Sequence, residues 1–212
     1  MSKELPQLVL DIEKRELGIS AGLQDRVIQT YGGLVHMDFA SPAVTSVTNA
    51  SATPSRSPYT PLDPALLPPF YLAYDTEAGG DSGAVHSTVR ARWESREPAL
   101  VEGMAALGGL ADQAVECLNS GDYGTLALLM ERNFATRLEL YGAQVVGAKN
   151  LQAVRLGGEM GLACKFTGSG GALLCMRREG GWLGAAEEQG AVEAFKQMGF
   201  AFVRVRIPPP PL

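Results

Sequence analysis

The chain has 212 residues, of which 46% are hydrophobic, and its formal net charge is −5. A chain of this length can form one large domain, or one domain with appendages. It has no apolar run near the roughly 20 residues that span a bilayer, no secretory signal at its start and no basic stripe for nucleic acid. We therefore expect a cytoplasmic protein that binds neither membrane nor nucleic acid.

The cysteine and histidine content argues against disulfides and metal sites. The three cysteines, Cys117, Cys164 and Cys175, are widely spaced among apolar residues, and the chain has two histidines. An odd number of cysteines without metal-ligand spacing is typical of a reducing compartment. We expect the three thiols to be buried as small hydrophobic side chains, and we predict no metal-ligating residue.

The N-terminal part of the chain predicts a strand, a helix and a second strand. The apolar segment Leu5–Ile12 is interpreted as a short strand, and Asp25–Tyr31 as a helix that ends at Gly32-Gly33. Leu34–Phe39 alternates apolar and polar residues, which is the strand period.

The next segments are punctuated by small residues and prolines. Ala40–Tyr59 is rich in Ser, Thr, Ala and Pro and predicts a mobile loop, and the proline-containing segment Leu62–Pro69 follows it. Phe70–Tyr74 predicts a buried strand. Thr76–Gly83 is a polar, glycine-rich turn.

The remaining sequence favours an α+β fold. Helices are predicted at Ala84–Glu94, Ala99–Asn119, Tyr123–Leu140, Asn150–Glu159 and Ala185–Met198. Two short strands are expected around glycines within Ala163–Met176, and a last strand over Phe200–Ile207. Since strands and helices mix without regular β-α-β alternation, we expect an antiparallel sheet with helices on one face.

An aspartate at a helix start is the first candidate for chemistry. Asp25 and Arg26 lie just inside the predicted helix, within the glycine-bracketed segment Gly18–Phe39. A carboxylate there can act as a base or an electrostatic partner. The plain alternative is a capping or helix-dipole role for Asp25.

A glycine-rich hairpin is the second candidate. Lys165–Ala172 reads Lys-Phe-Thr-Gly-Ser-Gly-Gly-Ala, with three glycines in four residues after a strand. Backbone N–H groups of such a loop can surround an oxyanion, although the Walker and Rossmann spacings are absent. The residues predicted to form a phosphate or active-site loop are Thr167, Gly168, Ser169, Gly170 and Gly171. A tight hairpin without function is the alternative.

Four further polar residues are candidates for binding. Asn133 and Arg137 lie at i and i+4 of a predicted helix, so one ligand can reach both. Ser82 and His86 follow the glycine-rich turn. A solvated arginine, and a histidine that only caps or packs, are the structural alternatives.

In this order, the motifs resemble the GHMP kinase superfamily and, within it, the glucuronokinases. The resemblance extends from about residue 12 to residue 205 and is carried by segments 16–39, 59–63, 66–69, 81–93 and 165–172. It implies a GHMP-kinase-like C-terminal domain and the transfer of the γ-phosphate of ATP, with Mg²⁺, to the anomeric hydroxyl of D-glucuronate. A small sugar acid and ATP would then be the partners.

The resemblance also implies roles for the candidate residues. Asp25 corresponds to the catalytic aspartate, which orients or deprotonates the attacking hydroxyl. The loop of residues 167–171 would lie near the phosphates. The residues implied to bind substrate are Arg26, Ser82, His86, Asn133 and Arg137; for Arg26 a structural ion pair is an equal alternative.

One departure from the family pattern bears on activity. The superfamily holds the ATP phosphates with a Gly- and Ser-rich loop upstream of the catalytic aspartate, whereas Met1–Ser20 has Gly18 as its one glycine and contains no Gly-Ser-Ser run. We expect a strand–helix–strand remnant of the N-terminal domain (1–40), a flexible loop (41–60), the C-terminal domain (61–207) and a Pro-rich tail (208–212). ATP binding and kinase activity are expected to be impaired. A non-catalytic binding module, or another sugar kinase such as an arabinose or galactose kinase, are the alternatives.

Overall fold

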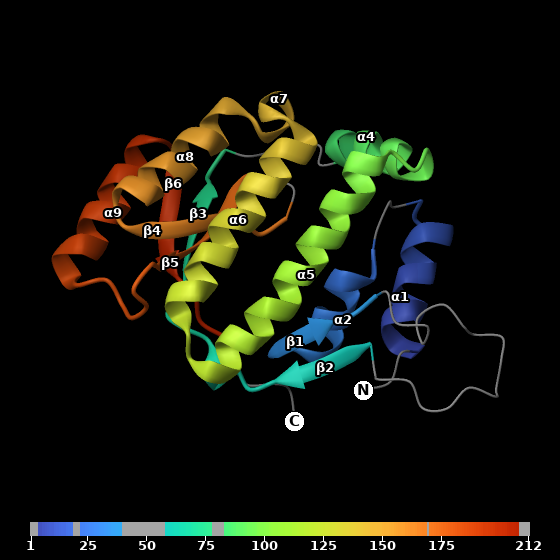
Figure 1. Ribbon diagram of the computed structural model, residues 1–212, viewed down its shortest axis with the longest axis horizontal. Helices are drawn as coiled ribbons and strands as arrows, with labels where there is room; N and C mark the ends of the chain where they lie inside the picture. Colours follow the sequence, from blue (N-terminus) through green and yellow to red (C-terminus); the bar gives the residue numbers. More distant parts are fainter. Residues whose placement is uncertain (1–3, 19–21, 40–57, 78–82, 169, 208–212) are drawn as a thin grey trace. The chain divides into compact units, whose positions relative to one another are not determined.

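The computed structural model describes residues 4–18, 22–39, 58–77, 83–168 and 170–207, and for residues 83–88 it describes only the backbone. The chain divides into two compact units, and Figure 1 labels their helices and strands. The small unit comprises Met1–Leu66 with Arg206–Leu212, and the large unit comprises Leu67–Val205. Each unit has its own secondary structure and is described by itself.

The small unit combines helices with a two-stranded antiparallel sheet. Its elements are α1 (Glu4–Arg15), α2 (Leu23–Tyr31), β1 (Leu34–Met37), β2 (Tyr59–Leu62) and the 3₁₀ turn η1 (Pro64–Leu66). Strands β1 and β2 pair with Leu34 opposite Leu62 and Met37 opposite Tyr59.

The predicted strand at Leu5–Ile12 is wrong, because these residues form helix α1. Leu5, Leu8 and Ile12 recur at the three- and four-residue spacing of a helix, and a proline in the first turn lacks only an N–H that would have no partner there. The start of the small unit is therefore helix–helix–strand, where strand–helix–strand was expected.

The next two predictions for the small unit are confirmed, with shifted ends. Helix α2 begins two residues before Asp25, and strand β1 ends at Met37. Most of the predicted loop Ala40–Tyr59, residues 40–57, lies outside the described residues. The prediction is wrong for the last residue of this segment, because Tyr59 is a buried residue of strand β2. Its ring lies 6.3 Å from that of Phe39.

The large unit is built on a four-stranded antiparallel sheet with the order β4-β5-β3-β6. Its elements are β3 (Tyr71–Asp75), α4 (Gly83–Glu94), α5 (Pro98–Ser120), α6 (Tyr123–Tyr141), α7 (Ala143–Val146), α8 (Ala148–Glu159), β4 (Leu162–Phe166), β5 (Ala172–Arg177), α9 (Ala185–Gln197) and β6 (Phe200–Arg204). The sheet strands with α8 and α9 form a split β-α-β arrangement. The predicted α+β class with an antiparallel sheet is confirmed.

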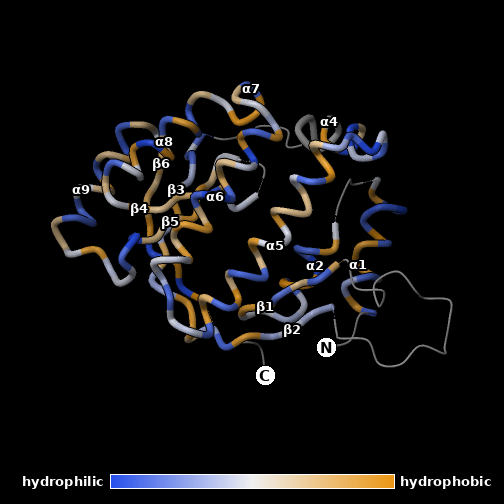
Figure 2. Tube along the Cα trace, viewed as in Figure 1, coloured by the Kyte–Doolittle hydropathy of each residue, from blue (hydrophilic) through white to orange (hydrophobic). Residues whose placement is uncertain are grey.

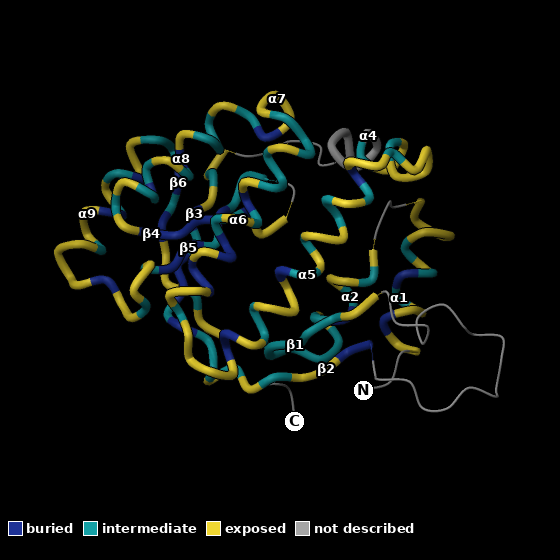
Figure 3. The backbone as a smooth tube through the Cα atoms, in the orientation of Figure 1, coloured by how far each residue is buried: buried dark blue, intermediate teal, exposed yellow. Residues whose placement is uncertain are grey.

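One face of the sheet forms the core of the large unit. Alternate strand residues enter this core and meet side chains of α8 and α9, so the strands carry hydrophobic residues and are largely buried (Figures 2 and 3). The ring of Phe202 stacks between Phe195 at 5.0 Å and Tyr71 at 4.9 Å. Cys164 and Cys175 face each other in this core, so the prediction of buried cysteines is confirmed for them and for Cys117.

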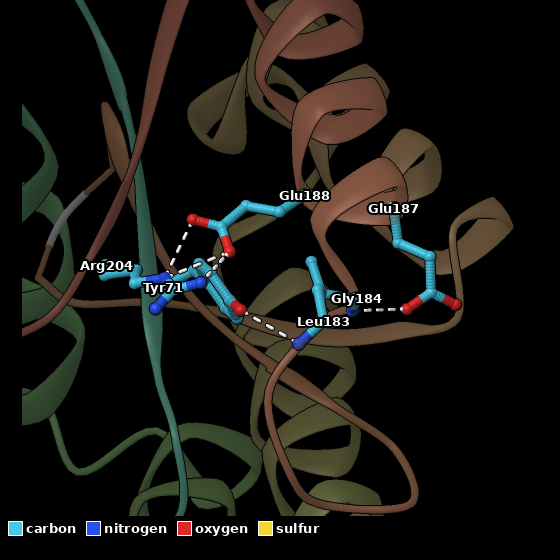
Figure 4. A network of polar contacts seen from close by, with 6 residues as sticks. All are labelled: Tyr71, Leu183, Gly184, Glu187, Glu188 and Arg204. Carbon is cyan, nitrogen blue, oxygen red and sulfur yellow. Dashed lines mark hydrogen bonds and ion pairs between the residues drawn. The ribbon is translucent and has the colours of Figure 1, made fainter.

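A polar network ties α9 to the sheet (Figure 4). The backbone N–H of Leu183, just before α9, donates to the Tyr71 hydroxyl at 2.9 Å. Arg204 of β6 donates from Nε to Glu188 of α9 at 2.8 Å and lies over the ring of Trp182 at 4.7 Å. These contacts fix the segment between β5 and the helix that covers the core.

Helices α5 and α6 form an antiparallel pair in the large unit (Figure 1). The turn between them has Gly121 in the left-handed region and Asp122 as the N-cap of α6, accepting from the N–H of Thr125 at 3.0 Å. Helix α6 then contacts edge strand β4, where the rings of Phe134 and Phe166 meet edge to face at 5.3 Å. This contact places one face of α6 beside the hairpin between β4 and β5.

Candidate active site

Asp25 is exposed at the start of helix α2 in the small unit. It is the third residue of the helix, after the N-cap Gly22, which has no side chain to cap the first turn. Its side chain is 72% exposed. A carboxylate in the first turn is stabilised by the helix dipole, and this one is accessible to a ligand.

Arg26 joins α1 to α2 and holds the neighbouring carboxylate. Its Nε donates to Glu13 of α1 at 2.5 Å, a second nitrogen also pairs with Glu13, and Nη1 lies 3.2 Å from Asp25 Oδ2. The Arg26 side chain is only 12% exposed. These contacts are those of the structural ion pair considered as an alternative above; a role of Arg26 in substrate binding stays a prediction.

The glycine-rich loop joins β4 to β5 in the large unit. The N–H of Thr167 donates to the carbonyl of Ala172 at 3.2 Å and closes the hairpin. Gly170 and Gly171 have φ of 138° and 74°, and a Cβ at Gly170 would lie 3.2 Å from the amide nitrogen of Asn150. The loop conformation therefore requires glycine at these positions. Ser169 lies outside the described residues.

The loop is held in place by Asn150 and Asp75, which were not among the predicted site residues. Asn150, at the start of α8, accepts from the N–H of Gly171 at 3.2 Å and donates to the carbonyl of Val146 at 2.8 Å. The carbonyl of Gly171 accepts from the N–H of Asp75 at 2.8 Å. The carboxylate of Asp75 accepts from Lys149 at 2.6 Å, and this contact lowers the pKa of Asp75.

Helix α6 contributes Arg137 and Asn133 beside the loop. Arg137 Nη1 donates to the carbonyl of Gly168 at 2.7 Å. The structure therefore brings a predicted substrate-binding residue together with the predicted phosphate or active-site loop. The Nε of Arg137 and the Oδ1 of Asn133 are buried and have no hydrogen-bond partner among the described residues. A buried polar atom without a partner costs about 1–3 kcal/mol, so such atoms beside a loop mark a place where a ligand or water can bind.

Besides Ser169, two further predicted site residues lie wholly or partly outside the described residues. Ser82 lies outside the described residues. The backbone of His86 belongs to α4, but its side chain is outside the description.

The described residues hold no cluster of three or more His, Cys, Asp or Glu side chains that could bind a metal ion. No helix within the described ranges has the length and apolar content to cross a membrane.

The sequence is similar to two curated plant proteins. Over 204 residues it is 40% identical to "Glucuronokinase 1" of Arabidopsis thaliana. This match covers 96% of the chain and 53% of the relative. Over 176 residues it is 45% identical to "Probable glucuronokinase 2" of the same species, covering 82% of the chain and 46% of the relative. The chain thus spans about half the length of these curated relatives. No protein-family model matches it.

Solved structures of GHMP kinases share the fold. Lactococcus lactis galactokinase, solved with galactose, superposes with a TM-score of 0.65 at 12% identity, covering 95% of this chain and 58% of the galactokinase. Methanococcus jannaschii mevalonate kinase gives a TM-score of 0.61 at 14% identity, covering 96% of this chain and 56% of that kinase. The chain is therefore similar in sequence to two glucuronokinases over about half of their length, and it shares the fold of these solved kinases.

Proposed function

We propose that the protein is an ATP-dependent sugar kinase of the glucuronokinase type, which phosphorylates the anomeric hydroxyl of D-glucuronate. The observation that carries this proposal is the 40% identity to "Glucuronokinase 1", because it extends over 204 of the 212 residues. A match of that extent includes both Asp25 and the glycine-rich loop.

In the proposed reaction, Asp25 receives the proton of the anomeric hydroxyl. As the sugar oxygen bonds to the γ-phosphorus of ATP, the bond from that phosphorus to the bridging oxygen breaks and ADP leaves. Phosphoryl transfer depends mainly on positioning and charge stabilisation. An exposed carboxylate held by Arg26, itself fixed to Glu13, meets the first requirement.

The other candidate residues contribute binding in this proposal. Arg137 and Asn133 bind the sugar carboxylate, since a guanidinium suits a carboxylate by its donor geometry. The loop of residues 167–171 lies near the phosphates. Ser82 and His86 are proposed to complete substrate binding. We also propose a cytoplasmic location.

We also propose that Mg²⁺ accompanies ATP in this reaction. Enzymes of this chemistry hold Mg²⁺ mainly through substrate phosphates and water, with one or two carboxylates. When bound, the ion would offset negative charge on the phosphates.

The test is a reaction followed by ³¹P NMR. The protein, at high concentration and over long times, is incubated with ATP, Mg²⁺ and D-glucuronate, and ADP and a sugar 1-phosphate are expected. Asp25→Asn should lower the rate by about 10²–10⁴-fold, the usual contribution of a positioned acid–base group. Asp112→Asn, in helix α5, is the matched control. An unchanged rate in Asp25→Asn would contradict the assigned role.

The substrate is tested in parallel with D-galactose and L-arabinose. Phosphorylation of either of these, with none of D-glucuronate, would show that the protein is a sugar kinase of different specificity.

We further propose that residues 1–212 by themselves turn over slowly. Residues 1–24 lack the Gly- and Ser-rich run with which the superfamily holds ATP. Titration of ATP by calorimetry should therefore show weak binding; a micromolar Kd would contradict the proposal. Sugar binding without any ADP formation would instead favour a non-catalytic binding module.

A further inference from the structure

Lys165 is a partly buried cation that the proposed reaction does not use. It is the fourth residue of edge strand β4, between Cys164 and Phe166, which enter the core. Because strand side chains alternate, Lys165 lies on the other face of the sheet. Its Nζ donates to the carbonyl of Phe166 at 2.7 Å. Burial, and then the charge of Arg137, lower its pKa from 10.5 to about 8.

Neither Lys165 nor Arg137 has a carboxylate partner among the described residues, although their like charges interact. Arg137 donates to the carbonyl of Gly168, and its Nε remains buried without a partner. On the same helix, Glu131 is engaged by Arg178 at 2.7 Å. Partial burial of two interacting cations without an anion costs free energy, and this cost falls when an anion binds to them.

The position of the pair is fixed by the fold. Arg137 comes from α6 and Lys165 from β4, immediately before the glycine-rich loop, and the loop itself is anchored by Asn150 and by Asp75. Two interacting cations beside a loop that is hydrogen-bonded in this way are a pre-organised site for an oxyanion.

We propose that Lys165 and Arg137 together form an oxyanion-binding subsite at the base of the glycine-rich loop. The anion is a carboxylate of a sugar acid or a phosphate group of a nucleotide. The assignment to these two ligands rests on the proposed function, whereas the charge arrangement does not.

The test compares anion binding in Lys165→Met and Arg137→Met with two matched controls. Arg132→Met removes an exposed arginine from α6, and Lys196→Met removes an exposed lysine from α9. Binding of D-glucuronate, of D-glucose as its neutral analogue, and of inorganic phosphate is measured by calorimetry on the full chain. Each subsite variant should weaken binding of one anion by about 10- to 100-fold, because a charged hydrogen bond is lost.

The comparison between D-glucuronate and inorganic phosphate shows which anion the subsite binds. Weaker binding of D-glucuronate alone assigns the subsite to the sugar carboxylate, and weaker binding of phosphate alone assigns it to the nucleotide. D-glucose binding and both control variants should be unaffected. Lys165→Arg, which keeps the charge, should retain binding and so separates loss of the cation from loss of folding.

The outcomes separate this proposal from the proposed function. Anion binding that depends on Lys165, without ADP formation, supports the subsite and overturns the kinase assignment. ADP formation with the same KM values in Lys165→Met and the wild type supports the kinase and overturns the subsite. Absence of anion binding by the wild type also overturns the subsite.

Discussion

Replacing Lys165 by methionine should stabilise the protein at neutral pH. Burial holds the pKa of Lys165 at about 8 in the folded state, against 10.5 when it is exposed. Since one pKa unit corresponds to about 1.4 kcal/mol, keeping this side chain charged at pH 7 costs about 3 kcal/mol of folding free energy. The hydrogen bond to Phe166 offsets about 1 kcal/mol of this cost. Lys165→Met should therefore gain about 2 kcal/mol.

The sign of this effect depends on pH in a defined way. Below pH 8 the lysine is charged in both states and the full cost is present. As the pH rises from 8 to 10.5, the folded state loses the proton before the unfolded state does, so the cost disappears. The advantage of Lys165→Met over the wild type should shrink across this interval.

Urea unfolding of both proteins at several pH values between 6 and 10.5 measures the difference directly, because other titrating groups are common to both. Lys196→Met, at an exposed position of α9, should show no such difference. The reasoning is refuted if Lys165→Met is less stable than the wild type at pH 7, or if the difference does not change with pH.

Substitutions at two glycines and at a buried tyrosine test the packing of the large unit. Gly157→Ala should destabilise by about 1–3 kcal/mol, because its Cβ would clash with the sulfur of Cys164, and Cys164→Ala should restore part of the loss. The neighbouring Gly158→Ala, with only ordinary contacts, should stabilise α8 by about 1 kcal/mol; equal effects at both glycines in chemical unfolding would contradict this account. Tyr71→Phe should cost about 1–3 kcal/mol, since the buried N–H of Leu183 loses its acceptor, and an unchanged Tm would show that water replaces it.

The fold was largely predictable where local patterns were long or clear. The helix at Tyr123–Leu140 and the hairpin in Ala163–Met176 follow from helical spacing and from glycines between strands, and both appear in the structure. The segment Leu5–Ile12 was misassigned because a short apolar run suits either a strand or a helix. Helix α7 has four residues between Gly142 and Gly147, too few to establish a period.

The candidate site was predictable only as separate pieces. Asp25 and the glycine-rich loop carry recognisable local patterns, whereas the contacts that fix them join residues far apart in the chain. Asn150 looks in the sequence like an ordinary residue of a helix start, yet it binds Gly171 across the fold. Lys165 was visible within the loop motif, but its burial and its lack of a carboxylate depend on how α6 packs against β4.

The position of Lys165 beside the loop lowers the folding stability of the protein and at the same time places a positive charge there. Among the described residues, Arg137, Asn150 and Asp75 contact Gly168 or Gly171 from α6, α8 and β3 of one compact unit, so these contacts do not require a ligand. A structural arginine could hold the carbonyl of Gly168 without a second cation nearby. Lys165 adds nothing to that contact and, through its own burial, lowers stability. A buried charge with this cost is expected to persist when an anionic ligand compensates it, which is why the stability and binding measurements on Lys165 should change together.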